Sequence, residues 1–269
     1  MRLAIQEDML YGRNLREKFQ LAKDVGFDGI EFWAKDIGHQ MDEAMDALVH
    51  TGLQASGINF GRHGSILDAD LIERERGLEL LRQALMDSSD LGAAGVGFAP
   101  AFFGTRIPDL SPYATANQLK DELLVAHVRT LEDFANAMGQ TLFIEPINRY
   151  ETDYMNTLGD AVRVAARRNH PRVKIVADLF HMALDEDDIA GAIRQHGAFI
   201  GCVHAADHNR RLPGQGFLPF AAAATALKDV GFDGWVSYEC GSPSENHMRA
   251  AQYANELEAS VKFMRDAGF

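Results

Sequence analysis

Segments of helix length in this chain end repeatedly at a glycine or a proline, and a short run of β-favouring residues follows each within a few positions. Glycine just past a helix end provides the left-handed C-cap, and proline also stops a helix. The tetrapeptide Gly-Phe-Asp-Gly occurs at residues 26–29 and again at residues 231–234, each time before such a run. The chain therefore alternates helices with strands. The residues that mark these boundaries are Gly26, Gly52, Gly92, Gly139, Pro171, Gly197 and Gly231.

This alternation predicts the fold class. Counting residues 3–6 as the first strand gives eight strands, each followed by a helix-sized segment. Strands and helices joined by right-handed crossovers form a parallel sheet, and eight such units in about 250 residues match a (β/α)8 barrel. The competing doubly wound sheet usually has a glycine-rich nucleotide loop after its first strand, whereas Gly12 is the only glycine in residues 6–14. We predict an α/β protein, a single (β/α)8 TIM barrel that spans residues 1–269 as one domain.

The same glycine and proline boundaries predict where the strands and helices lie. Strands are expected at residues 3–6, 30–33, 53–58, 95–98, 142–145, 173–178, 199–204 and 235–239. Helices with strong apolar periodicity are expected at residues 15–25, 71–91, 116–138, 158–168 and 247–265.

The charge of the chain limits its partners. The sequence has 26 lysines and arginines against 39 aspartates and glutamates, a net charge of −13. Phosphate backbones and anionic membranes repel such a chain, so we expect no nucleic-acid and no membrane partner. A run of about 18 apolar residues is absent, and residues 1–8 resemble a strand rather than a signal peptide. With Cys202 and Cys240 interpreted as buried thiols in a reducing compartment, these features predict a soluble cytoplasmic protein.

Four consecutive predicted strands end in a residue that can bind metal. The run from Thr141 leads into Glu145, and Pro146 stops the strand there. A carboxylate at the end of a buried strand is costly unless something pairs with it, and α/β proteins bind ligands at this end of their strands. For one such residue a salt bridge is a sufficient explanation. The three strands that follow, however, end in Asp178, His204 and Glu239.

In a closed barrel these four strand ends curve around one half of the mouth, so their side chains converge. Three carboxylates in one place repel one another and raise each other's pKa unless a cation lies among them. Three carboxylates and one imidazole suit Mn²⁺, Mg²⁺ or Co²⁺ better than a structural zinc ion, which prefers cysteine and histidine. We therefore predict one divalent metal ion, held by Glu145, Asp178, His204 and Glu239.

A second group of polar residues follows the same strands. Glu151, His181 and Arg210 come six, three and six residues after the strand ends at Glu145, Asp178 and His204. Loops after the strands of a barrel surround its active site, so these side chains are placed to hold a hydroxylated substrate. The alternative for Glu151 and Arg210 is a surface ion pair, either with each other or with a local partner, which contributes little to stability. For His181 it is a histidine satisfied at the start of a helix.

At these residues the sequence resembles a known family. The motifs are Glu-Pro-x-Asn-Arg-Tyr-Glu-Thr from residue 145, Asp-x-Phe-His-Met from residue 178, His-x-x-Asp-x-Asn-Arg-x-x-Pro-Gly-x-Gly from residue 204, and Tyr-Glu at residues 238–239. They resemble the xylose-isomerase-like barrels, in the sugar isomerase/epimerase branch. Within it they are most similar to ketose 3-epimerases of the D-tagatose and D-psicose type and to keto-gluconate epimerases. The resemblance covers the whole chain and is strongest from residue 141 to residue 240.

The resemblance implies roles for these residues. It implies that one divalent metal, commonly Mn²⁺, is held by Glu145, Asp178, His204 and Glu239, and that the sugar is bound by Glu151, His181 and Arg210. The implied activity is epimerisation at the carbon next to the ketone of a ketose or keto sugar acid, through a metal-bound enediolate. Glu145 and Glu239 act in this scheme as acid and base on opposite faces of the flat intermediate. Family members often form homodimers or homotetramers.

Three other functions fit parts of the pattern. An aldose–ketose isomerase, or one of the hydroxypyruvate type, uses the same metal ligands but moves the proton on one face. An endonuclease IV-like hydrolase shares the barrel, but its three-zinc cluster needs a histidine at the end of the fourth strand, where residues 96–100 are Val-Gly-Phe-Ala-Pro. The third is a metal-binding barrel without enzymatic activity.

The first half of the chain is expected to line the other half of the mouth and to select the shape of the substrate. The residues placed there are Glu31, Trp33, Asn59, Arg62, His63, Phe98, Pro100, Phe102 and Phe103. A phosphorylated substrate is an alternative, with its anion held by Arg210, Arg211, Gly214 and Gly216. We expect a small-molecule substrate that is a free sugar or keto acid.

Overall fold

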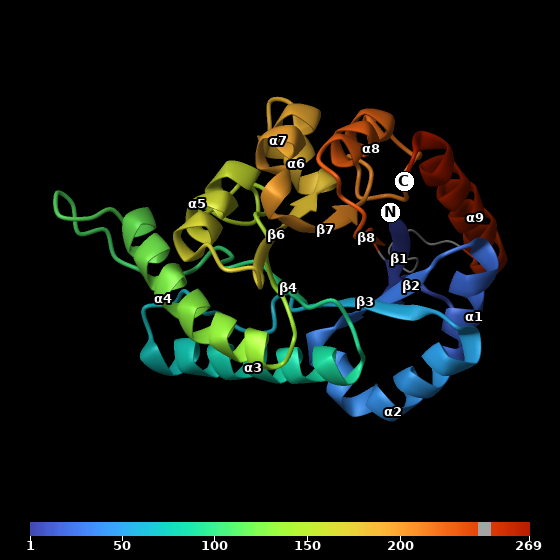
Figure 1. The fold of residues 1–269 in the computed structure, drawn as a ribbon, viewed down its shortest axis with the longest axis horizontal. Helices are drawn as coiled ribbons and strands as arrows, with labels where there is room; N and C mark the ends of the chain where they lie inside the picture. Colours follow the sequence, from blue (N-terminus) through green and yellow to red (C-terminus); the bar gives the residue numbers. More distant parts are fainter. Residues whose placement is uncertain (242–248) are drawn as a thin grey trace.

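The computed structural model describes residues 1–241 and 249–269. Within these residues the strands form a closed barrel in chain order, β1 to β8, and every neighbouring pair is parallel. The helices surround the barrel on its outside (Figure 1). The prediction of a single (β/α)8 TIM barrel is confirmed. The strands are β1 (Arg2–Gln6), β2 (Gly29–Trp33), β3 (Gln54–Asn59), β4 (Val96–Phe98), β5 (Leu142–Ile144), β6 (Val173–Asp178), β7 (Ile200–Ala205) and β8 (Trp235–Tyr238).

The helices follow the strands in the expected alternation. Those predicted at residues 15–25 and 158–168 are found with the same limits. The last helix is described from Ala250 and continues past the predicted end at residue 265, while its predicted start, His247, lies outside the described residues. The helices are α1 (Leu15–Val25), α2 (Ala34–Thr51), α3 (Leu71–Asp90), α4 (Ala116–Ala137), α5 (Leu158–Arg168), α6 (Leu179–Asp185), α7 (Ile189–His196), α8 (Phe220–Asp229) and α9 (Ala250–Ala267), with the short 3-10 helices η1 (Glu7–Met9) and η2 (Gly197–Phe199). Within the described residues, none of the helices has the length and apolarity needed to cross a membrane.

The glycines at the helix ends explain most of the predicted boundaries. Gly26 and Gly231, the first residues of the two Gly-Phe-Asp-Gly copies, both have positive φ, 101° and 74°. Gly197 differs from the prediction, because its φ is −52° and the chain continues into η2. A Cβ at Gly197 would lie 2.5 Å from Val230 Cβ, so close packing rather than a left-handed cap requires this glycine. Asn169, not Pro171, ends α5 in the left-handed conformation.

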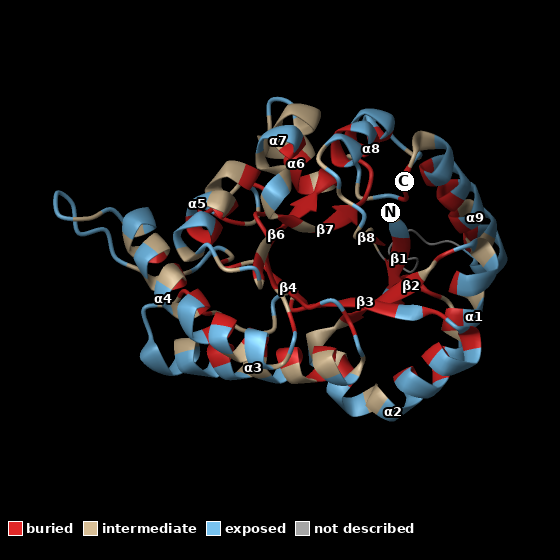
Figure 2. Cartoon of the chain, viewed as in Figure 1, coloured by how far each residue is buried: buried red, intermediate tan, exposed pale blue. Residues whose placement is uncertain are grey.

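The interior of the barrel is closely packed, and Figure 2 shows its strands as buried. Alternation along β5 directs Phe143 inward, where it contacts Val176 and Cys202. Two glycines make room for this ring: a Cβ at Gly201 would lie 2.5 Å from Phe143 Cε1, and one at Gly95 would lie 2.8 Å from Cε2. The same alternation directs the residue two positions on, Glu145, toward the barrel axis. Polar groups at the strand ends therefore lie above the packed side chains of Phe143, Val176 and Cys202.

The start of α5 supports a prediction about stability. The Asp160 carboxylate accepts hydrogen bonds from the backbone N–H of Asn156 (3.0 Å) and Thr157 (3.1 Å) and from Arg163 Nη1 (2.7 Å). Burial acts to raise the pKa of Asp160, but these donors, above all Arg163, hold it below its ordinary value. Because the folded pKa is the lower one, the carboxylate stabilises the fold above the unfolded pKa of about 4, and this contribution is lost as pH falls through the folded pKa.

We expect Asp160→Asn to lower the free energy of unfolding by about 1 kcal/mol at pH 7. This cost should diminish as the pH of the measurement is reduced below about 4, because the wild-type carboxylate then becomes protonated. Urea unfolding of both proteins between pH 7 and pH 3 measures it. Asp229→Asn, which removes a half-exposed ion pair between Asp229 of α8 and Arg194 of α7, is the control and should cost less than about 0.5 kcal/mol. A cost that is the same at every pH would contradict the ionic contribution.

Candidate metal centre and active site

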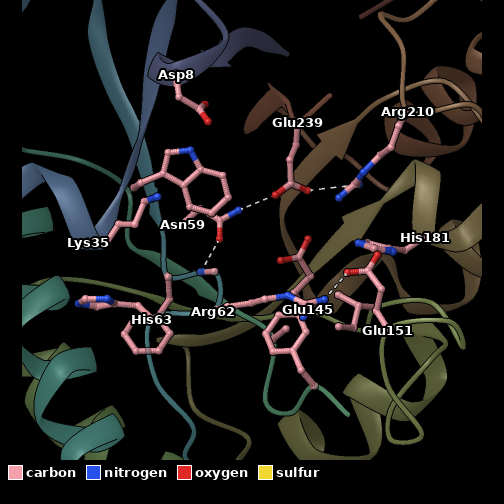
Figure 3. Close-up of a pocket in the computed structure, with 16 residues that line it drawn as sticks. Asp8, Lys35, Asn59, Arg62, His63, Glu145, Glu151, His181, Arg210 and Glu239 are labelled. Carbon is pink, nitrogen blue, oxygen red and sulfur yellow. Dashed lines mark hydrogen bonds and ion pairs between the residues drawn. The ribbon is translucent and has the colours of Figure 1, made fainter. Parts of the chain in front are cut away.

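The strand ends of both halves of the barrel surround one cavity. It has a volume of about 390 Å³ and is lined by residues that follow β1 to β8, among them Glu145, Glu151, His181, Arg210 and Glu239. Figure 3 shows Glu145 and Glu239 approaching the centre of this cavity from different strands, with Asn59 and Arg210 on either side of Glu239. Five of the seven predicted site residues therefore line one pocket. The other two, Asp178 and His204, do not line it, but His204 lies 2.7 Å from Glu145.

The four predicted metal ligands lie together. Asp178 ends β6 and pairs in register with His204 of β7, while Glu145 and Glu239 each follow directly after a strand. His204 Nδ1 lies 2.7 Å from Glu145 Oε1, 3.5 Å from Glu239 Oε2 and 4.0 Å from Asp178 Oδ2. One ligand atom from each of the three carboxylates, and one from His181, also lie within 4.8 Å of one another. His181, which was predicted to bind the sugar, thus lies as close to the three carboxylates as a metal ligand would.

The hydrogen bonding of Asp178 indicates whether this cluster suits a metal ion. Its Oδ1 accepts hydrogen bonds from the N–H groups of Phe180 (2.7 Å) and His181 (2.9 Å), so this oxygen caps α6. Its Oδ2 is buried and has no hydrogen-bond partner among the described residues. A buried carboxylate oxygen without a partner is unfavourable, and a cation supplies what is lacking. Carboxylates and one imidazole are also the donors that Mn²⁺ and Mg²⁺ accept in proteins, so the residues present fit a divalent ion.

The ionisable groups of the cluster influence each other strongly. Burial raises the pKa of Glu145, and the neighbouring His204 compensates this in part. Burial also acts to raise the pKa of Glu239, but His204 and Arg210 hold it well below its ordinary value. For His204, burial favours the neutral form, yet Glu31, Glu145 and Glu239 together raise its pKa well above the usual range. Excess negative charge in a buried site produces this pattern, and a bound cation relieves it.

Side chains of β1 to β3 contact the predicted ligands from the opposite side of the barrel. His204 Nε2 lies 3.1 Å from Glu31 Oε1. Gln6 Nε2 donates to Glu31 Oε2 at 3.0 Å and to Glu239 Oε1 at 3.2 Å, and Asn59 Nδ2 donates to the same Glu239 oxygen at 2.8 Å. Gln6 and Glu31 are register partners across β1 and β2. Sequence reasoning placed Glu31 and Asn59 at the mouth but missed Gln6, which could have been found as another polar residue at a strand end.

His181 and Glu151 are connected through Asn148. Asn148 donates to His181 Nδ1 from its backbone N–H (3.1 Å), and its side-chain nitrogen lies 2.8 Å from the same atom. Since Nδ1 accepts, the proton of neutral His181 is on Nε2, which lies 3.8 Å from Asp178 Oδ2. Asn148 Nδ2 also donates to Glu151 Oε1 at 2.9 Å. The partner of Glu151 in its ion pair is Arg62, at 3.3 Å (Figure 3), and not the Arg210 considered from the sequence.

Arg210 is held in an unusual backbone conformation, with φ of 61°. Its guanidinium lies 4.3 Å from the centre of the Phe180 ring, and Nη1 lies 3.8 Å from Asp178 Oδ2 and 3.7 Å from Glu239 Oε2. Nη1 is buried and has no hydrogen-bond partner among the described residues. A left-handed non-glycine residue stores strain, and such residues concentrate at functional sites. Arg210 thus presents an unused donor at the carboxylate cluster.

The loop considered as a phosphate cradle is already filled by Asp207. The carboxylate of Asp207 accepts from the N–H groups of His208 (2.9 Å), Gly214 (3.0 Å) and Leu218 (3.2 Å). A Cβ at Gly216 would lie 2.2 Å from Asp207 Oδ1. An incoming anion would meet this carboxylate instead of free N–H donors. The loop geometry therefore does not favour the phosphorylated substrate.

The residues expected at the first half of the mouth divide between core and cavity. Trp33, Arg62, His63 and Phe102 line the cavity as expected. Phe98 is buried in the core instead. Pro100 and Phe103 line a neighbouring cavity, which shares Arg62 and Phe102 with the first.

Comparison with known proteins agrees with this architecture. Residues 19–267 match the family described as the xylose isomerase-like TIM barrel. The chain belongs to this family. It is 32% identical over 269 residues to the 3-dehydro-D-guloside 4-epimerase of Escherichia coli, covering 98% of this chain and 99% of that protein. It is 28% identical over 225 residues to the D-psicose 3-epimerase of Agrobacterium fabrum, covering 80% and 75% of the two chains.

Solved structures give the same result. The apo crystal structure of the 3-keto-D-glucoside 4-epimerase from E. coli matches with a TM-score of 0.86 at 30% identity, over 99% of both chains. The D-psicose 3-epimerase of Clostridium cellulolyticum matches with a TM-score of 0.88 at 23% identity, over 100% and 99% of the chains, which shows the shared fold. These relatives support the assignment of this chain to the isomerase class of enzymes.

Proposed function

We propose that this protein is a divalent-metal-dependent sugar epimerase that inverts the carbon next to the ketone of its substrate. The observation that supports this most directly is the convergence of two buried carboxylates, Glu145 and Glu239, on one cluster with the unpartnered Oδ2 of Asp178. Epimerisation needs a proton to leave one face of a planar intermediate and another to arrive on the opposite face. Two glutamates that reach one cavity from different strands meet this requirement. The epimerase relatives support the same reaction class.

The residues proposed to hold the ion are Glu145, Asp178, His204 and Glu239, because His204 Nδ1 lies within 4.0 Å of an oxygen of each of the three carboxylates. Their oxygen-rich composition favours Mn²⁺, with Mg²⁺ or Co²⁺ as alternatives. When bound, the ion supplies Lewis acidity to the substrate carbonyl, which makes the adjacent C–H more acidic. The carboxylates of the cluster are largely buried, so charges in it interact strongly.

The two proposed bases have different surroundings. Glu239 accepts hydrogen bonds from Gln6 and Asn59, which fix the orientation of its carboxylate. Glu145 contacts His204 at the end of β5. One carboxylate removes the proton from the carbon next to the ketone while the other, protonated, delivers a proton to the far face. The roles exchange in the reverse direction, so neither group is restricted to acid or base.

Three residues are proposed to hold the sugar. His181 presents Nε2–H toward the cluster, Glu151 offers a carboxylate fixed by Asn148, and Arg210 offers its unpartnered Nη1. Such donors and acceptors match the hydroxyl and carbonyl groups of a small sugar. We propose an unphosphorylated substrate, because Asp207 fills the loop that would bind phosphate. The free thiols of Cys202 and Cys240 agree with a cytoplasmic location.

The reaction is tested by incubating the Mn²⁺-loaded protein in D₂O with a panel of ketoses, keto acids and keto-glycosides. NMR then reports where deuterium enters. Deuterium at the stereogenic carbon next to the ketone, which is C3 in a 2-ketose, together with a mixture of epimers, is the expected result. Deuterium at C1 or C2 with an aldose product would instead establish the aldose–ketose isomerase, which the same ligand set can support. If the metal is demonstrably bound and deuterium enters none of the compounds, the result would contradict both the epimerase and the isomerase activity.

Replacing Arg210 tests the sugar-binding role. We expect Arg210→Ala to raise KM about 10- to 100-fold, because a charged hydrogen bond contributes about 1.5–3 kcal/mol, while kcat changes less. The neighbouring Arg211 is exposed, so Arg211→Ala is the matched control and should leave both constants unchanged. Steady-state kinetics on the substrate found above provide the measurement. An unchanged KM in Arg210→Ala would remove this residue from the site.

A further inference from the structure

The two oxygens of Glu239, one of the proposed bases, have different partners. Asn59 Nδ2 donates to Oε1 at 2.8 Å, and Gln6 Nε2 donates to the same oxygen at 3.2 Å. The other oxygen, Oε2, lies 3.5 Å from His204 Nδ1 and 3.7 Å from Arg210 Nη1. Figure 3 shows the carboxylate between Asn59 and Arg210. Because two N–H donors occupy Oε1, Oε2 is the oxygen left for chemistry in the cavity.

The amide of Asn59 is itself held in one orientation. Asn59 ends β3 and is 3% exposed. Its Oδ1 accepts the Gly61 N–H at 2.9 Å, so Nδ2 has to point the other way, toward Glu239. Gly61 has a φ of 55°, and a Cβ there would lie 2.6 Å from Trp33 Cζ3. The turn at the end of β3 is therefore closely packed, and it fixes the donor that Glu239 receives.

The plane of a glutamate carboxylate depends on such partners. The last torsion of a glutamate side chain has only a broad preference, whereas hydrogen bonds to an ionised oxygen are short and strong. Two amides on one oxygen therefore set the plane of Glu239. The other proposed base is held differently, because the Glu145 carboxylate lies 2.7 Å from His204 Nδ1. Within residues 1–241 and 249–269, no side-chain amide donates to Glu145.

We infer that Asn59 is a positioning residue of the reaction, which orients the Glu239 carboxylate so that Oε2 exchanges the proton with the substrate. The inference rests on the proposed function. In one direction the C–H bond next to the ketone breaks, its electron pair moves toward the ketone oxygen, and the proton goes to Oε2 of Glu239. Glu145 then delivers a proton to the opposite face of the same carbon. In the other direction Glu145 takes the proton and Glu239 delivers one.

This assignment predicts that losing the Asn59 donor affects the two proton transfers unequally. The hydrogen bond of Asn59 is to Glu239, so its loss should slow the transfers to and from Glu239 and leave those of Glu145 fast. A small misplacement of a reacting group can cost on the order of 10²-fold in rate. A residue needed only for the fold would slow both transfers alike.

Asn59→Ser tests the assignment, because the serine hydroxyl can still accept the Gly61 N–H but is too short to reach Glu239. With the Mn²⁺-loaded protein we expect kcat/KM to fall about 10- to 100-fold, by the same factor in both directions because the equilibrium constant is unchanged. For the epimer that loses its proton to Glu239, the primary deuterium isotope effect should rise. For the other epimer, deuterium from D₂O should enter the recovered substrate before the product forms.

Two further variants separate positioning from folding. Asn59→Asp keeps the size of the side chain and the acceptor for the Gly61 N–H, but it replaces the donor with an oxygen. It should therefore lose at least as much activity as Asn59→Ser. Gln140 is also a buried amide, which accepts from Ser88 Oγ at 2.7 Å before the start of β5, at the opposite end of the barrel. Gln140→Ser is the matched control and should keep the wild-type rates and isotope effects.

Crystal structures of the wild type and of Asn59→Ser provide a readout that does not depend on turnover. In the variant we expect the turn at Gly61 to be retained and the carboxylate of Glu239 to be rotated or spread over two orientations. The same carboxylate plane in both proteins would overturn the inference.

The kinetic outcomes also separate the inference from the function on which it rests. Wild-type kcat/KM in Asn59→Ser and Asn59→Asp would restrict Asn59 to its turn and overturn the inference. A raised KM with equal isotope effects for the two epimers would make Asn59 a sugar-binding residue and overturn it as well. If the wild-type protein exchanges a proton in neither epimer, the proposed function itself fails. Unequal isotope effects in an active but slowed Asn59→Ser would support both.

Discussion

Replacing either Glu145 or Glu239 with glutamine is expected to abolish proton exchange next to the substrate ketone, with a loss of about 10³-fold or more in turnover. General acid–base catalysis by one positioned group contributes about 10² to 10⁴-fold, and glutamine keeps the shape of the side chain without its proton chemistry. Both residues are also proposed to hold the metal, so each variant loses a negatively charged ligand. Deuterium incorporation from D₂O, followed by NMR, measures the loss in each variant separately.

A matched control separates this effect from damage to the fold. Glu132 is also buried, but it is on α4, away from the mouth, and pairs with Arg168 at 2.5 Å. Glu132→Gln should cost stability without touching the chemistry, so its activity per folded molecule should be that of the wild type. Circular dichroism and bound Mn²⁺, measured for all three variants, show how much folded, loaded protein each sample holds. Wild-type turnover in either Glu145→Gln or Glu239→Gln would refute the two-base proposal.

The fold was predictable because its signals are local. Asn14 accepts a hydrogen bond from the Glu17 N–H and Thr157 forms a capping box with Asp160, and in both places a short stretch of sequence sets where the helix begins. Gly197 was misinterpreted because its reason is a tertiary one. The contact with Val230 joins residues far apart in the chain, and no local pattern contains it.

The proposed metal ligands could be found from the sequence for a related reason. Once the barrel is closed, residues at the ends of neighbouring strands must converge, so Asp178 and His204 were identifiable without coordinates. Gln6 could not be connected to Glu239 in the same way, because that hydrogen bond depends on the register between the first and last strands. The pairing of Arg62 with Glu151 likewise depends on the conformations of two loops. Side-chain partners across the barrel thus remained beyond sequence reasoning.

Glu31 contacts His204, one of the proposed metal ligands, so we expect its replacement to have a large effect on metal binding. His204 directs Nδ1 toward the proposed metal ligands and Nε2 toward Glu31. For neutral His204 to donate Nδ1 to an ion, its proton has to be on Nε2, and Glu31 Oε1 at 3.1 Å is the acceptor that holds it there. Gln6 fixes this acceptor in turn, since its Nε2 donates to Glu31 and to Glu239. One amide therefore connects the group that orients the histidine with one of the proposed ligands.

Glu31→Gln is expected to weaken Mn²⁺ binding about 10- to 100-fold, the usual cost of losing the partner that orients a ligating histidine. Glutamine fills the same space, but its own amide N–H₂ faces either His204 or Gln6, both of which are donors. Isothermal titration calorimetry gives the dissociation constant, with Glu132→Gln as the buried control that should bind Mn²⁺ like the wild type. Nitrogen NMR of the Mg²⁺-loaded protein reports which ring nitrogen of His204 carries the proton, independently of turnover. An unchanged dissociation constant, with the proton on Nε2 in both proteins, would show that the proposed ligands fix His204 without help from Glu31.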